Sequence, residues 1–143
     1  MKPSHRRSEK CSIRIVGCAV LLIIAGIQAA FGELSPDAYK RMQDKAPEHL
    51  QIRILSVNTQ DEKDGSQVIA EAKVTAVTRS ASHLKLGDVI RISYFHGTRL
   101  APGSSPVPLL VQDQSYQAFL RCYSTRDKSY SPEAGGKSFP EVK

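Results

Sequence analysis

A long stretch with two-residue alternation is the feature that most constrains this chain. Between residues 67 and 79, apolar side chains recur at every second position, and most intervening positions are polar or charged. Because successive side chains of a strand point to opposite faces, this pattern predicts a half-buried β-strand. The alanines among the inward positions favour close approach of a second layer, or the narrow interior of a small barrel. The inward residues are Val68, Ala70, Ala72, Val74 and Ala76.

The remaining patterns predict more short strands and one helix. Ser35 can cap a helix over residues 36–45, Pro36 suits its first position, and Pro47 ends it. Residues 58–66 form a polar connection with a turn signal at Asp64-Gly65. Further strands are predicted at 49–57, 89–95, 107–111 and 115–124, with 107–111 at an edge because of its prolines.

These segments predict a mainly β fold: a small five-stranded, OB-like antiparallel barrel with one short N-terminal helix. A two-sheet sandwich is the alternative, although seven strands are usual in that architecture. The barrel domain is expected to span residues 33–124. Residues 125–143 are polar and rich in Ser, Gly and Pro, and predict a loosely attached tail on which Phe139 can dock.

The first thirty-two residues have the layout of a secretory signal. A basic head is followed by an apolar run over residues 15–27 and by small residues before a cleavage site after Gly32. A spanning helix needs about 20 predominantly apolar residues, so the run favours cleavage over a permanent anchor. The sequence therefore predicts a secreted or periplasmic protein, with an uncleaved N-terminal membrane anchor as the alternative.

Removal of this segment changes the charge and the cysteine content. The whole chain has 20 basic and 14 acidic residues, of which residues 1–32 hold five and one, so 15 and 13 remain. Basic residues are then interspersed with acids, which argues against a nucleic-acid footprint. Cys122 is the one cysteine left after residue 32, and its place on an apolar strand face predicts a buried thiol.

Four short motifs occur in an order that resembles a known family. They are Ala-Lys-Val at 72–74, Gly-Asp-Val-Ile-Arg-Ile at 87–92, Pro-Leu-Leu at 108–110 and Tyr-Gln-Ala-Phe-Leu at 116–120. This order resembles the OB-fold of netrin-like and tissue-inhibitor-of-metalloprotease-like modules over about residues 51–122. Those inhibitors resemble one another in a metal-chelating N-terminal cysteine and a disulfide framework. With Cys122 alone after residue 32, this chain matches them in fold and not in the inhibitory residues.

A ligand surface is predicted on the outer face of the last strand. Phe119, Arg121 and Tyr123 alternate with the inward set and could bind a ligand by stacking and cation–π contact. The alternative is that the helix or the tail covers them. His96 and Arg99, on or next to a Pro/Gly-rich loop, are further candidates. The hypothesis is a non-enzymatic module that binds a protein or another extracytoplasmic ligand.

Other function classes have weaker support in the sequence. A small secreted hydrolase could use Ser82, His83 and Asp88, but these residues lack a Gly-x-Ser-x-Gly elbow. An OB-type single-strand nucleic-acid binder would need a basic face with stacked aromatics. The histidines and cysteines lack the His-x-x-x-His and Cys-x-x-Cys spacings, so neither a metal nor another cofactor is predicted.

Overall fold

A computed structural model describes residues 34–98 and 104–142. The predicted signal at 1–32 therefore lies outside the described residues. Helix α2 (Pro36–Lys45) begins as expected, with the Ser35 hydroxyl accepting from the Ala38 amide at 3.3 Å. The strands are β1 (Glu48–Glu62), β2 (Gly65–Ser80), β3 (Val89–Gly97), β4 (Ser115–Ser124) and β5 (Ser129–Pro132), followed by a 3₁₀ turn η1 (Gly135–Lys137).

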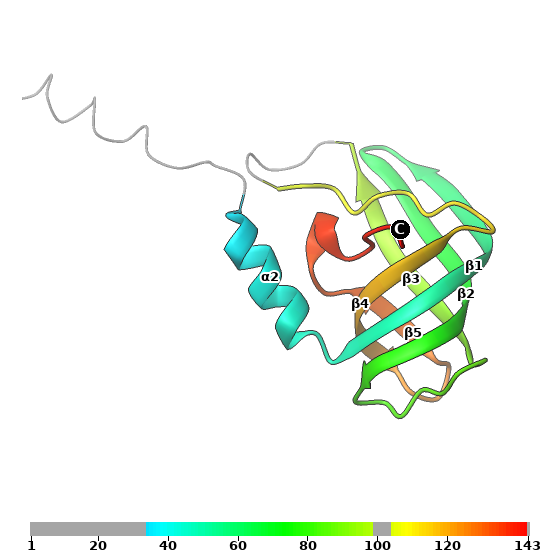
Figure 1. Cartoon of the computed structure of the whole chain (residues 1–143). Coiled ribbons are helices and arrows are strands. Elements are labelled where there is room, and N and C mark those ends of the chain that lie inside the picture. Colours follow the sequence, from blue (N-terminus) through cyan, green and yellow to red (C-terminus); the bar gives the residue numbers. More distant parts are fainter. Residues whose placement is uncertain (1–33, 99–103, 143) are drawn as a thin grey trace, which may run out of the picture. The chain divides into compact units, whose positions relative to one another are not determined.

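The strands close into a barrel in the order β1-β2-β3-β5-β4, with β4 returning to β1 (Figure 1). The predicted fold class is confirmed: the chain is a mainly β, five-stranded barrel with one short helix, consistent with a small OB-like barrel. One detail of the prediction is wrong, because β3 and β5 pair in parallel while the other pairs are antiparallel.

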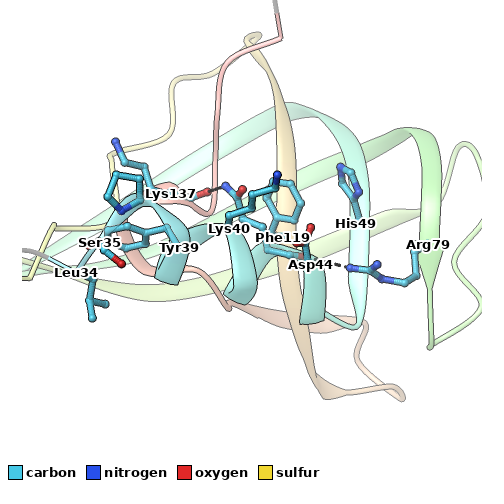
Figure 2. Close-up of a pocket in the computed structure, with 11 residues that line it drawn as sticks. Leu34, Ser35, Tyr39, Lys40, Asp44, His49, Arg79, Phe119 and Lys137 are labelled. Carbon is cyan, nitrogen blue, oxygen red and sulfur yellow. Dashed lines mark hydrogen bonds between the residues drawn. The ribbon is translucent and has the colours of Figure 1, made fainter.

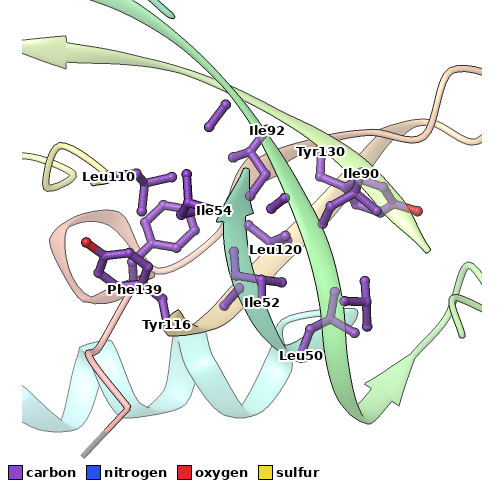
Figure 3. Packing of buried hydrophobic residues seen from close by; sticks show 14 of the residues in the cluster. Leu50, Ile52, Ile54, Ile90, Ile92, Leu110, Tyr116, Leu120, Tyr130 and Phe139 are labelled. Atoms are coloured by element: carbon purple, nitrogen blue, oxygen red, sulfur yellow. The ribbon is translucent and has the colours of Figure 1, made fainter. Parts of the chain in front are cut away.

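The alternating faces predicted from sequence form the core. Val68, Ala70, Ala72 and Val74 on β2 are fully buried and belong to one cluster with inward side chains of the other strands. Figure 3 shows labelled members of this cluster from the other strands packed together. The alanines fit where the barrel interior is narrow. Cys122 is half-buried and packs against this core. The central side chains are Leu50, Ile52, Ile54, Ile90, Ile92, Tyr94, Tyr116, Ala118, Leu120 and Tyr130.

Two segments between the helix and β4 differ from the predictions. Residues 58–62 continue β1 instead of forming a loop, because the ladder to β2 runs to the Glu62–Gly65 pair. Residues 107–111 form no strand; Pro108 has no N–H to donate, and the segment is held by side chains. The Tyr94 hydroxyl donates to the Pro108 carbonyl at 2.8 Å and accepts from the Leu110 amide at 3.3 Å.

The prediction of a loosely attached tail over 125–143 is wrong. β5 comes from this segment and pairs with both β3 and β4. After β5 the chain continues along the same edge of β4, where the Ser138 and Pro140 carbonyls accept from the Phe119 and Gln117 amides. Phe139 docks as expected, is 4% exposed and lies against Tyr94 and Tyr116. The fifth strand is therefore in the segment that composition marks as a tail.

Candidate functional site

A pocket of about 760 Å³ lies between α2 and the barrel (Figure 2). α2 forms one wall, and the start of β1, the end of β2, the middle of β4 and the turn η1 form the others. This "α2 pocket" is lined by Leu34, Ser35, Pro36, Tyr39, Lys40, Gln43, Asp44, His49, Arg79, Phe119 and Lys137.

Aromatic rings form the inner surface of the α2 pocket. Phe119 points outward from β4 and is 6% exposed, because Ala46 and Ala134 pack beside it. The His49 ring stacks on Phe119, with centroids 4.4 Å apart and planes 25° apart. Tyr39, on the inward face of α2, is also buried. These contacts give the pocket an apolar, aromatic floor.

Hydrogen bonds to neighbouring elements hold α2 beside the barrel. The Gln43 side-chain amide donates to the Lys137 carbonyl at 2.7 Å, which joins the helix to η1. The Arg79 guanidinium donates to the Ala46 carbonyl at 2.9 Å and to the Gln43 carbonyl at 3.1 Å. Carbonyls at a helix C-terminus need such partners, and a cation there complements the helix dipole. The width of the pocket is therefore set by specific bonds at both walls.

The charged side chains that line the pocket are mostly basic. Lys40, Arg79 and Lys137 carry positive charge, and Asp44 is the acidic residue among the lining side chains. Lys40 and Lys137 are exposed, so their ammonium groups can reach a ligand without repacking the protein. An apolar floor with a basic rim can hold a molecule that combines an apolar body with an anionic group.

The structure separates the residues predicted for the ligand face. Phe119 is covered by α2 and the segment after β5, so its predicted exposure is wrong and the alternative of a covered ring is confirmed. Tyr123 is 87% exposed near the end of β4. Arg121 pairs with Glu133 on the segment after β5. Of these three side chains, Phe119 alone lines the α2 pocket.

The two loop candidates are also apart from the α2 pocket. The His96 Nδ1 atom is 2.7 Å from the Val107 carbonyl oxygen, a bond that fastens the 104–110 segment to β3. Arg99 lies outside the described residues. Sequence patterns did not indicate Tyr39, Lys40, Arg79 or Lys137 as site residues, although Tyr39 is the buried residue of the predicted helix. Arg79 and Lys137 carry no local signal, because tertiary contacts bring them beside the helix.

The residues of the hydrolase alternative line a second, polar pocket of about 290 Å³. The Ser82 hydroxyl is 2.8 Å from the Tyr130 hydroxyl. The Asp88 carboxylate accepts from the Lys85 amide at 2.8 Å and from the Lys128 ammonium at 2.9 Å, and these bonds lower the pKa of Asp88. Both oxygens of Asp88 and the Ser82 hydroxyl are thus bonded to groups other than His83.

Within residues 34–98 and 104–142, no three His, Cys, Asp or Glu side chains gather as a metal site would require. The helices in that same part of the chain are too short or too polar to span a bilayer. A scan against protein-family models, a search of curated proteins and a search of solved structures each return no match.

Proposed function

We propose that this chain is an exported, non-enzymatic binding module whose ligand site is the α2 pocket. The ligand has an apolar body, aromatic or aliphatic, next to an anionic group such as a carboxylate. The apolar N-terminal segment supports export, and the resemblance to netrin-like modules remains a prediction. The observation that carries the proposal is the stacked Phe119–His49 floor beneath three basic side chains.

The size and lining of the pocket support this ligand class. Pockets for small ligands usually enclose about 300–1,000 Å³, are lined by apolar and aromatic groups, and carry few polar groups that fix orientation. The α2 pocket lies within that range and has that composition. Phe119 and Tyr39 are 6% and 5% exposed and form a packed floor below the apolar body, while Lys40 and Lys137 offer ammonium groups to the anion. Each partly exposed ion pair would add about 0.2–1 kcal/mol.

Titration with 1-anilinonaphthalene-8-sulfonate, an aromatic anion that fluoresces in apolar sites, tests the proposal. We expect saturable binding with one site per chain. Replacement of both exposed lysines, Lys40→Glu with Lys137→Glu, should weaken binding about tenfold because attraction becomes repulsion. The matched control, Lys63→Glu with Lys73→Glu, makes the same charge change at exposed positions outside the pocket and should bind like the parent chain.

A neutral probe tests whether the lysines act through charge, and a pair of peptides tests whether the natural anion is a protein C-terminus. N-phenyl-1-naphthylamine lacks the charge and should bind the parent chain and the Lys40/Lys137 variant equally. A short peptide ending in Leu-Phe with a free carboxylate, compared with its amide, distinguishes a protein C-terminus from a small amphiphile as the natural source. Equal loss of anion binding in both double variants, or no loss in either, would contradict the α2 pocket as the site.

A further inference from the structure

The second half of β1 has an open edge. β4 pairs with β1 from Glu48 to Arg53, and Ile54 then exchanges backbone bonds of 2.9 Å with Asp113 and Gln114. Leu55 is a bulged residue without a partner on β2. From Ser56 to Glu62, β1 pairs with β2 on one side, and none of the residues that the structure describes forms a strand pair on the other. Alternate N–H and C=O groups of these seven successive residues therefore face outward along this edge.

This edge lacks most features that block strand addition. Natural edge strands are usually protected by proline, lysine, bulges or a covering element. Residues 55–62 contain neither proline nor lysine, and the irregularity between Ile54 and Ser56 lies at the end of the segment. The ladder beyond it is regular up to the Glu62–Gly65 pair. The backbone is therefore ready to accept another strand.

We propose that the open edge of β1, residues 55–62, binds an extended basic segment of a partner protein as an added β-strand. Such strand addition derives affinity from main-chain hydrogen bonds and specificity from alternate side chains. The surface is distinct from the α2 pocket, and the proposal does not depend on the function proposed for that pocket.

The negative charge along the open edge of β1 favours a basic partner segment. Residues 55–62 carry two acidic side chains, Asp61 and Glu62, and no basic one, and Glu71 lies on the neighbouring strand β2. Glu62 faces away from the barrel interior, and Glu71 faces the same way opposite Ser56. Opposite charges on adjacent strands stabilise a pair and like charges destabilise it, so a second copy of this acidic edge is a poor partner.

The two faces of β1 set the pattern of the added strand. Val57 is half-buried and packs against the core, so an inward β-branched side chain beside it would extend the core. On the outer face, Ile69 lies opposite Asn58 and is 42% exposed, which offers apolar surface to the stem of a lysine. The matching segment alternates Lys or Arg outward with Val, Ile or Thr inward.

The peptide acetyl-(Lys-Val)₃-Lys-amide is the probe, and amide hydrogen exchange measured by NMR is the readout. We expect the peptide to slow exchange at alternate amides between residues 55 and 61 by at least tenfold, and to leave the residues around α2 unchanged. The peptide acetyl-(Glu-Val)₃-Glu-amide has the same strand propensity and should give no protection. Protection confined to another surface, or none at millimolar peptide and low ionic strength, overturns the proposal.

Charge-reversal variants distinguish binding of the basic peptide at the open edge of β1 from nonspecific electrostatic attraction to the protein. Glu62→Lys with Glu71→Lys should weaken binding of the basic peptide at least tenfold. Asp37→Lys with Glu141→Lys makes the same charge change at exposed positions that lie away from the edge and outside the α2 pocket lining, and should bind like the parent. Equal affinities in the two variants would contradict the proposal. A dimer by light scattering, with amides 55–61 protected in the absence of peptide, would show a second copy in place of the partner.

Discussion

Single polar side chains inside the barrel connect elements that are distant in sequence. Glu48 is fully buried, and its Oε1 atom accepts from the Ser82 amide at 3.0 Å, while no described group bonds its Oε2 atom. The Ser82 hydroxyl meets the Tyr130 hydroxyl at 2.8 Å. Burial raises the pKa of the Tyr130 phenol, although the Ser82 bond opposes this shift. Glu48, Ser82 and Tyr130 thus link β1, the turn before β3, and β5.

Removal of the Tyr94 hydroxyl tests how much one such side chain contributes to stability. Tyr94→Phe should lower the free energy of unfolding by about 1–3 kcal/mol, because the buried Leu110 amide loses its acceptor and the Pro108 carbonyl loses its donor. The comparison with the parent chain by urea unfolding at neutral pH checks this value. Equal stability of the two proteins would mean that water replaces both bonds without cost.

The Tyr94 phenol also predicts that the free energy of unfolding depends on pH in the alkaline range. Burial raises the pKa of Tyr94 to about 12 from an ordinary value of 10.0. Between these values the folded chain keeps a proton that the unfolded chain releases, so its contribution to stability is complete below pH 10 and is lost as pH rises toward 12. The stability difference between the parent and Tyr94→Phe should therefore shrink above pH 10. A constant difference across this range would contradict the assignment.

Among the elements, the β1–β2 hairpin depends on a close backbone approach at its tip. Gly65 begins β2 and pairs with Gly97 on β3. A Cβ atom on Gly65 would collide with the His96 carbonyl oxygen and would lie 2.7 Å from the Phe95 ring. Because the carbonyl belongs to the paired backbone of β3, it cannot move without disturbing the ladder.

Alanine substitution of two glycines tests this interpretation. Gly65→Ala should cost about 1–3 kcal/mol of unfolding free energy through overpacking. Gly87→Ala is the matched control, since Gly87 has a φ of +89° but open space around its Cα, and it should cost only about 1 kcal/mol. Thermal and urea unfolding of both variants measure the difference. A larger loss for Gly87→Ala would mean that backbone conformation outweighs crowding.

For the whole molecule, the C-terminal segment decides whether the barrel closes. β5 is short, yet it is the strand between β3 and β4. Tyr130 from β5 is 2% exposed and Phe139 covers one part of the core. Loss of a buried aromatic side chain typically costs about 3–5 kcal/mol, and small domains have about 5–15 kcal/mol in total.

Deletion of residues 126–143 should therefore abolish cooperative folding. The truncated chain loses Tyr130 and Phe139 together with the backbone bonds on that edge of β4. Circular dichroism with thermal melting checks this outcome. Deletion of residues 142–143 serves as the control because it removes one long backbone bond, from the Val142 amide to the Ser115 carbonyl at 3.4 Å, and keeps Tyr130 and Phe139. A truncated chain that melts cooperatively near the parent temperature would show that four strands suffice.

Local patterns in the sequence predicted most elements and only part of the candidate site. Alternation identified β2, β3 and β4, and Ser35 with Pro36 located the helix, because these signals depend on near neighbours. β5 was missed because its four residues, Ser-Tyr-Ser-Pro, are too few to show alternation, and one of its two partners, β3, lies far away in the chain. Phe119 was predicted to contact a ligand, and it lines the α2 pocket from beneath the helix.

The sequence by itself determined a β-rich domain, the inward faces of its main strands and an N-terminal segment typical of export. These properties follow from periodicity and composition, which the residues carry without reference to distant partners. The tertiary structure alone decided the closing strand, the α2 pocket and the open edge of β1. Each of these depends on which segments meet in space, and backbone hydrogen bonds between distant segments leave no periodic signal in either one.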